Sequence, residues 1–280
     1  MISGPMIESA IQIAEKRQGH RGQNVYAGRP WVLLQRSFMA LRSSTWFVVL
    51  SGFFEPVFYL LAFGYGIGQY IEGITTGSGD RVSYAMYIAP ALLASSAMNG
   101  AIYDSTWNVF FKLKESKIYD AMMATSLGPL DVALGEITWA LLRGLMYSIA
   151  FITVVTPMGL VDSWWGLLAI PAAVLIAFGF AGLGMAITSK MENFQQMNWI
   201  NIVLLPMFLF SGAFFPVEYY PAPIEILVKV MPLWHANELM RGLMLSNINL
   251  GLLGHVAYFA LLAVIGVWAT TKRLSALFLK

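Results

Sequence analysis

Three ionisable side chains lie within apolar stretches of this sequence, where a charge is costly. Glu55 precedes Pro56 in the first stretch, Asp104 lies in the second and Arg143 in the third. Inside a membrane such groups face protein or water, and they mark ion pairs, transport paths or proton relays. We expect Glu55 and Arg143 to neutralise each other between helices. Contact of Glu55 with a cargo or a gate is the alternative, and a proton relay is disfavoured because no longer series of acids or histidines accompanies them.

Residue patterns for other chemistry are missing from the sequence. It has no phosphate-binding G-x-x-x-x-G-K-[ST] loop, no H-E-x-x-H pair and no nucleophile elbow. It has no cysteine, and its three histidines (His20, His235 and His255) are too scattered for a metal pattern. We therefore expect no catalytic residue, no metal and no cofactor bound by this chain, which is not predicted to be an enzyme.

Composition places the chain in a membrane. Hydrophobic residues make up 58% of the 280 residues and charged residues 11%, with a mean hydropathy of +0.66. Soluble domains carry roughly a quarter charged residues. The formal charge of +2 is too small to indicate nucleic-acid binding. The sequence predicts an all-α integral membrane protein.

Six stretches approach the length of a membrane-spanning helix, which needs about 20 apolar residues. They are Trp46–Gly66, Tyr84–Val109, Val132–Thr156, Leu167–Thr188, Met197–Gly212 and Leu252–Thr271. The fifth is short and runs into Gly212 and Pro216, which break helices. We expect one or two short re-entrant helices to follow it on the outer side, around Ile224–Val230 and His235–Met244.

Positive charge predicts the orientation. With both termini in the cytoplasm, thirteen Lys and Arg residues lie on the inner side and three on the outer side. Residues 1–28 then form a cytoplasmic tail, residues 29–44 an interface helix and residues 45–280 one six-helix membrane domain. The interface helix has Leu34, Phe38 and Leu41 on one face, which suits the inner leaflet. A frayed start of the first span is the alternative.

The loop between the second and third spans has a pattern of its own. Lys112, Lys114 and Lys117 precede apolar residues at helical spacing, which are Ile118, Tyr119, Met122 and Met123. One face of a short helix would be apolar and the other basic. Gly128 and Pro129 predict its end. Such a helix suits a soluble partner, and an ordinary polar loop with a helical turn is the alternative.

Several segments in their order resemble the type-2 ABC exporter permeases, and among them the branch that exports nodulation factors (lipo-oligosaccharides) and drugs. These segments are EPVFYLLAFGYGIG, YIAPALLASSAMNGA, KLKESKIYDAMMATSLGPLDVALGE, FLFSGAFFPVEYYP and MPLWHANELMRGLML. The resemblance extends from Arg29 nearly to the C-terminus. The polar tail before Gly28 is longer than in the family pattern.

The resemblance implies the type-2 ABC permease fold, a dimer with a second copy or paralogue, and a cytoplasmic ABC ATPase that binds ATP-Mg. Lys112–Ala124 would be the coupling helix, with Tyr119, Met122 and Met123 buried in the ATPase and the lysines at the rim. It further implies export of an amphipathic cargo across a bacterial plasma membrane. The implied path and gate residues are Phe54, Glu55, Tyr59, Met207, Phe210, Phe214 and Phe215.

Two other classes compete with this interpretation. An ion-coupled secondary transporter would use Glu55, Asp104 and Arg143, and inverted repeats would favour it. A membrane-bound lipid-modifying enzyme would show clustered polar groups at one interface. Neither signal is present in the sequence, and purification together with an ATPase would distinguish the exporter from both.

Overall fold

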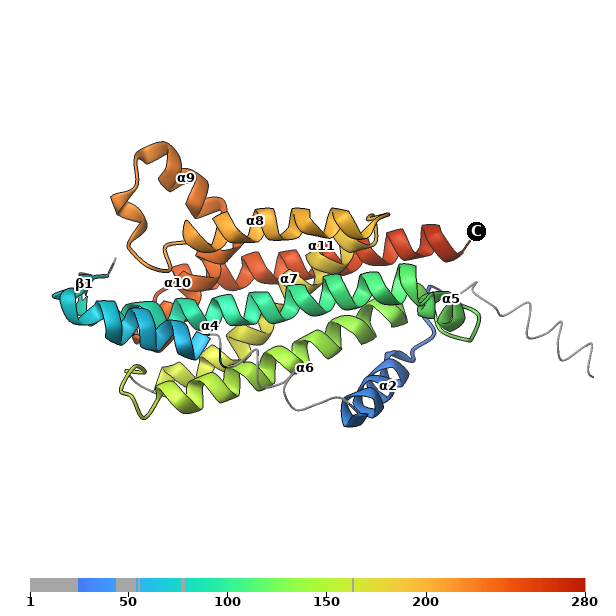
Figure 1. The fold of residues 1–280 in the computed structure, drawn as a ribbon, viewed down its shortest axis with the longest axis horizontal. Helices are drawn as coiled ribbons and strands as arrows, with labels where there is room; N and C mark the ends of the chain where they lie inside the picture. Colours follow the sequence, from blue (N-terminus) through green and yellow to red (C-terminus); the bar gives the residue numbers. More distant parts are fainter. Residues whose placement is uncertain (1–24, 44–53, 55, 77–78, 163, 280) are drawn as a thin grey trace, which may run out of the picture.

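The computed structural model forms a bundle of long helices that lie along one common direction (Figure 1). It describes residues 25–43, 54, 56–76, 79–162 and 164–279. Its principal helices are α4 (Tyr84–Tyr103), α6 (Pro129–Val155), α7 (Ala169–Thr188), α8 (Asn198–Leu209) and α11 (Gly251–Phe278). The all-α prediction is confirmed.

Four helical stretches within the described residues are long and apolar enough to span a membrane. They are Tyr84–Glu115, Pro129–Val155, Trp164–Thr188 and Gly251–Phe278. Part of the predicted first span lies outside the described residues, which include its helical end at 56–67. The predicted fifth span is only the 12-residue α8, because Gly212 at φ +72° turns the chain soon after it.

The second span is longer than predicted because α4 continues through two π-helical segments. These are η3 (Asp104–Asn108) and η4 (Phe111–Glu115), and the loop helix α5 (Ile118–Met123) follows them. Ser83 caps the start of α4 by accepting a hydrogen bond from the backbone N–H of Met86. π-Helical turns are rare and occur often at functional sites.

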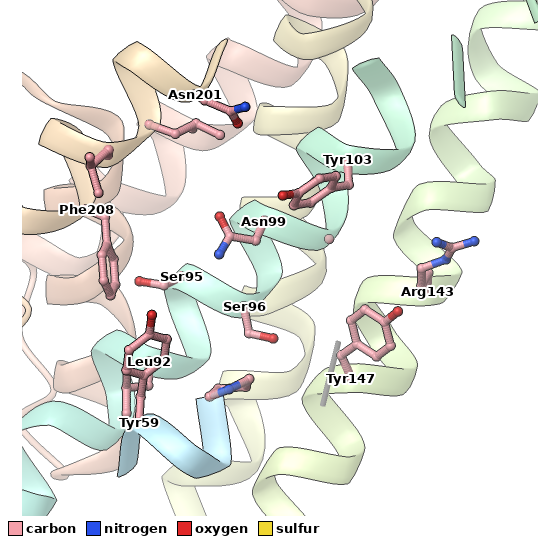
Figure 2. Close-up of a pocket in the computed structure, with 14 residues that line it drawn as sticks. Tyr59, Leu92, Ser95, Ser96, Asn99, Tyr103, Arg143, Tyr147, Asn201 and Phe208 are labelled. Carbon is pink, nitrogen blue, oxygen red and sulfur yellow. The ribbon is translucent and has the colours of Figure 1, made fainter. Parts of the chain in front are cut away.

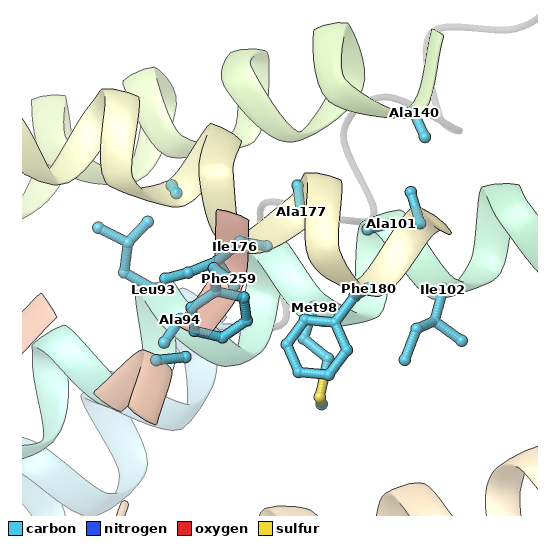
Figure 3. Close-up of a cluster of buried hydrophobic side chains, with 14 of the residues drawn as sticks. Leu93, Ala94, Met98, Ala101, Ile102, Ala140, Ile176, Ala177, Phe180 and Phe259 are labelled. Carbon is cyan, nitrogen blue, oxygen red and sulfur yellow. The ribbon is translucent and has the colours of Figure 1, made fainter. Parts of the chain in front are cut away.

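The backbones of α7 and α11 pack closely together at the centre of the bundle. A Cβ added to Gly266 of α11 would lie 2.4 Å from the carbonyl carbon of Gly182 on α7, so this position requires glycine, and a Cβ on Gly182 would lie 3.2 Å from the Cα of Gly266. The rings of Phe180 on α7 and Phe259 on α11 lie with their centroids 5.8 Å apart (Figure 3). Dispersion contacts of this kind replace the hydrophobic driving force that lipid removes.

The N-terminal helix α2 (Pro30–Ser43) packs against α6. A Cβ on Gly135 would lie 2.7 Å from Leu33 Cβ, so the glycine makes room for this contact. Leu34, predicted to face lipid, is buried against the chain itself, whereas Trp31 is 61% exposed. Phe38 meets Trp139 edge-on at 5.3 Å, and the side chain of Leu41 lies outside the described residues.

Short elements form the end of the bundle opposite the C-terminus (Figure 1). A hairpin of β1 (Ile74–Thr75) and β2 (Arg81–Val82) was not predicted. The remaining short elements at this end are η1 (Leu60–Ile67), η2 (Gly68–Tyr70), η5 (Trp164–Leu168), η7 (Val217–Tyr219), α9 (Ala222–Val230) and α10 (Pro232–Met244). The short η6 (Phe194–Met197) precedes α8 at the other end, where Phe194 packs on Trp107 and Phe111. The two predicted short helices after the fifth span correspond to α9 and α10.

Candidate functional site

A cavity of about 710 Å³ opens between residues 56–67, α4, α6 and α8. Figure 2 shows one wall formed by α6 and the other by α8, with α4 between them. Polar side chains dominate the α4 and α6 surfaces, which carry Ser95, Ser96, Asn99, Tyr103, Arg143 and Tyr147. The α8 side adds Asn201 and the apolar Leu204, Leu205 and Phe208. The cavity thus combines a polar surface with an apolar one.

Arg143 forms its ion pair with Asp104. Its Nη1 lies 3.0 Å from Asp104 Oδ1, and the amide of Asn108 donates to the same oxygen at 2.8 Å. Asp104 Oδ2 is buried without a hydrogen-bond partner. This contact is possible because α4 and α6 pack directly together. Glu55, the predicted partner, lies outside the described residues, so its pairing with Arg143 stays a prediction.

A second ion pair joins η4 to α6, closer to the loop than the first pair. Lys112 Nζ approaches Glu136 Oε2 to 2.6 Å, and the two side chains are 17% and 5% exposed. Lys112 was expected at the rim of a docking surface. It instead joins η4 to α6, because a lysine this poorly hydrated needs a carboxylate beside it.

The loop helix is shorter than the predicted Lys112–Ala124. Lys117 adopts the left-handed conformation at φ 48°, which separates η4 from α5. Tyr119 is fully buried, and Met122 and Met123 are also buried in the main hydrophobic core. Burial raises the pKa of Tyr119 well above its usual value. These three side chains were predicted to enter an ATPase, but the structure commits them to the chain's own core.

The loop therefore exposes a polar surface, which we call the loop face. It comprises Glu115, Ser116, Lys117, Asp120, Ala121 and Ala124. Lys114 and Ile118 are half-buried at its edge. Asp131, fully buried behind the loop, accepts hydrogen bonds from the backbone N–H groups of Ala27, Arg29 and Gly128 at 2.7, 2.7 and 2.9 Å. This carboxylate attaches the N-terminal segment to the start of α6, and sequence reasoning missed it.

Comparison with known proteins agrees with this architecture. Residues 30–245 match the model of the family described as ABC-2 type transporter. The chain belongs to that family. Its relatives include Nodulation protein J of Sinorhizobium fredii strain NGR234, which is 29% identical over 86% of this chain and 91% of the relative. Nodulation protein J of Rhizobium leguminosarum bv. trifolii is 28% identical over 87% and 92%, and that of Rhizobium meliloti 26% over 88% and 93%.

The predicted path residues of this ABC-2 type transporter occupy three environments. Tyr59 lines the cavity, and its ring lies 6.2 Å from that of Phe208. Met207 is buried, and Phe214 packs between Phe63 and Phe208 at centroid distances of 5.3 and 5.2 Å. The exposed members away from the cavity are Phe54, which stacks on Phe58, and Phe210 and Phe215, which lie beside Tyr220.

The polar cavity residues of the transporter were mostly missed by sequence reasoning. Ser95, Asn99 and Tyr103 recur every four residues along α4, which places them on one face of that helix. This periodicity within a hydrophobic span was a usable signal. Tyr147 stands one turn after Arg143 for the same reason. Nothing in the sequence alone indicated that Asn201 of α8 would face them.

A hydrogen-bonded cluster holds the break after α8. Arg241 Nη2 and the Tyr87 hydroxyl both donate to the carbonyl oxygen of Gly212, at 3.0 and 3.1 Å. The Arg241 guanidinium also stacks over the Tyr87 ring at 4.0 Å, and Asn237 donates to the Ser211 carbonyl at 3.0 Å. The backbone carbonyl groups of the irregular segment after α8 are therefore hydrogen-bonded to protein side chains, as the short fifth span requires.

Two histidines that are far apart in sequence meet in the fold of the transporter. Nδ1 of His235 on α10 lies 2.7 Å from Nδ1 of His255 on α11, and Tyr258 stacks on the His235 ring at 4.0 Å. They were predicted to be scattered. No group of three or more potential ligands occurs among the described residues, so the pair by itself indicates no metal centre.

Proposed function

We propose that this chain is the permease subunit of an ABC exporter in the bacterial plasma membrane, with both termini in the cytoplasm. It moves an amphipathic molecule outward, of the class of glycolipids, lipo-oligosaccharides or hydrophobic drugs, and a separate ATPase hydrolyses ATP-Mg to drive it. The cavity carries this proposal, because a mainly polar wall on α4 and α6 faces α8, where Asn201 stands beside three hydrophobic side chains. Such a lining suits a cargo with both a hydrated head and a hydrocarbon part.

The loop face supplies the contact with the ATPase. Four of its six exposed side chains are polar or charged and the other two are alanines, while Tyr119, Met122 and Met123 stay in the core. A push on the loop face reaches η4 through the short chain connection at Lys117. The Lys112–Glu136 ion pair then passes the displacement to α6, which forms one wall of the cavity.

A second copy or a paralogue covers the apolar surface around α8. Trp199 and Val203 on α8 and Phe58 before η1 are exposed, and all three lie on the elements that border the cavity. A dimer across this surface would enclose the cavity between two subunits. Lipid covers the parts of the surface that the partner leaves free.

Ion-coupled secondary transport is the weaker candidate. Membership of the ABC-2 type family favours energy from an ATPase. Asp104, which would have to bind and release an ion, is held by Arg143 and Asn108 and is almost completely buried.

The test is reconstitution with an ABC ATPase that co-purifies with this chain. Lys117→Ala combined with Asp120→Ala alters the loop face without entering the core, so we expect the variant to insert normally but to lose most of its effect on ATPase turnover. Glu225→Ala with Lys229→Ala is the matched control, because it removes an exposed i,i+4 ion pair on α9 far from the loop. Transport driven by an ion gradient without ATP would overturn the proposal, and so would failure of any ABC ATPase to associate.

A further inference from the structure

Arg143 is accessible from the cavity, whereas its counterion is not. The Arg143 side chain is 23% exposed and lines the cavity, while the Asp104 side chain is 3% exposed and does not. A molecule in the cavity can therefore reach the guanidinium without first displacing anything bulky. Figure 2 places Arg143 and Tyr147 on the α6 wall, across from Phe208 on α8.

The carboxylate that holds Arg143 is itself poorly satisfied. Both of its partners, Arg143 and Asn108, bond to Oδ1, and Oδ2 is buried with none. Arginine presents five N–H donors in a planar fork that favours bidentate binding of an oxyanion. The contact with Asp104 uses one oxygen at 3.0 Å, so it is not the bidentate pair that the guanidinium can form, and Tyr147 also hydrogen-bonds to this side chain.

The surroundings of Arg143 define what could use it. Tyr147, Asn99 and Ser96 lie along the same wall and offer groups that bond to hydroxyls and oxyanions. Leu204 and Leu205 on the opposite side offer hydrocarbon contact. The complementary ligand is an amphiphile whose head carries one negative charge beside polar groups.

We propose that Arg143 is the head-group binding residue of the cavity and that Asp104 is its counterion at rest. The phosphate, sulfate or carboxylate of an amphipathic cargo replaces the Asp104 carboxylate at the guanidinium. The inference rests on the proposed function in taking this cavity as the cargo site. Release of Asp104 frees the first residue of η3, and η3 leads through η4 to the loop face. Binding of cargo therefore changes the conformation of the surface that contacts the ATPase.

Binding of simple probes to the full chain in phosphatidylcholine nanodiscs tests this, with empty nanodiscs as the blank. The probes are octyl phosphate, the neutral octyl glucoside and inorganic phosphate, all below micellar concentrations. We expect octyl phosphate to bind more tightly than the other two. Asp104→Asn should raise the affinity for octyl phosphate about tenfold, because the competing carboxylate charge is gone. A tenfold change in affinity corresponds to about 1.4 kcal/mol of binding free energy. Arg143→Gln should abolish the preference for octyl phosphate over octyl glucoside.

Matched variants separate this role from a structural one. Lys112→Gln breaks the other buried pair between the same helices, so it should lower stability and leave the octyl phosphate affinity unchanged. If Arg143→Gln fails to fold, Asp104→Asn with Arg143→Gln leaves no buried charge unpaired and serves in its place. Unchanged or weaker octyl phosphate binding in Asp104→Asn would overturn the inference. Equal affinity for inorganic phosphate would show that the site recognises the phosphate alone and not an amphipathic molecule.

Failure of this inference is distinguishable from failure of the proposed function. A permease that still stimulates its ATPase and exports a neutral amphiphile, but shows no preference for octyl phosphate, refutes only the role of Arg143. A chain that associates with no ATPase refutes the exporter, whatever the probes show.

Discussion

Lys112 and Glu136 form an ion pair 2.6 Å long between η4 and α6, and Asp104 and Arg143 form a second pair of opposite polarity between the same two helical stretches. The stretch from α4 to η4 contributes one acid and one base, and α6 contributes the complementary two. This alternation specifies one register between the helices, because a shift would bring like charges together. The loop is thereby tied to the wall of the cavity.

Substituting one residue of the Lys112–Glu136 pair should lower the free energy of unfolding much more than substituting both. Lys112→Ala or Glu136→Gln alone leaves a buried charge and should cost about 3–5 kcal/mol. The double variant should lose much less than the sum of the two. Denaturation in detergent measures all three. Additive losses would show that the two charges do not interact.

Tyr119 should support the isolated permease, without any ATPase present. Because its side chain is fully buried, Tyr119→Ala should cost about 3–5 kcal/mol, as for other large aromatic residues in cores. Asp120→Ala on the exposed face of the same helix should stay within about 0.5 kcal/mol. Thermal unfolding of the two variants in detergent checks this. Equal stability of the two variants would favour the sequence-based prediction that Tyr119 binds the ATPase.

Asp131 should keep the N-terminal segment attached to the bundle. Asp131→Asn removes the charge that three backbone N–H groups share, and hydrogen bonds to charged groups contribute about 1.5–3 kcal/mol each. We expect faster hydrogen exchange at Ala27 and Arg29 and faster proteolysis nearby. Asp120→Asn is the control. Protection equal to that of the wild type would contradict the role of Asp131 in attaching the N-terminal segment.

Phe214 and Phe215 should differ sharply as cysteine probes, which are clean because the chain has no cysteine. Phe214 packs between Phe63 and Phe208 in its own subunit, so Phe214→Cys should react slowly with a membrane-impermeant maleimide. Phe215 is 40% exposed, so Phe215→Cys should react quickly or cross-link to a second subunit. Rapid labelling at 214 would show that this position is open to solvent and is not packed between Phe63 and Phe208.

The histidine pair should make the fold sensitive to acid. Burial, and then the neighbouring His255 ring, lowers the pKa of His235 to about 4 from 6.5. The unfolded chain takes up this proton below about pH 6.5 and the folded chain only below about pH 4, so stability falls as the pH drops through that window. The apparent Tm should decrease between pH 7 and pH 5. His235→Gln should flatten this decrease, and an unchanged profile would exclude His235 as its source.

The sequence by itself determined the class of the protein, because hydropathy reports directly how much of a chain lipid can surround. It also predicted the short α8 and the helices α9 and α10, since Gly212 and the prolines restrict the backbone locally. The resemblance to type-2 permeases followed from several such local segments in a fixed order. These are properties that neighbouring residues decide among themselves.

Tertiary structure decided which partner each polar side chain found. The sequence places Arg143 within reach of several acidic groups, and the packing of α4 on α6 brings it to Asp104. In the same way, the pattern of Tyr119, Met122 and Met123 predicts an apolar face but not what covers it, and the bundle itself covers it. The physical reason is that periodicity specifies a direction around one helix axis, whereas a contact requires the position and rotation of a second helix.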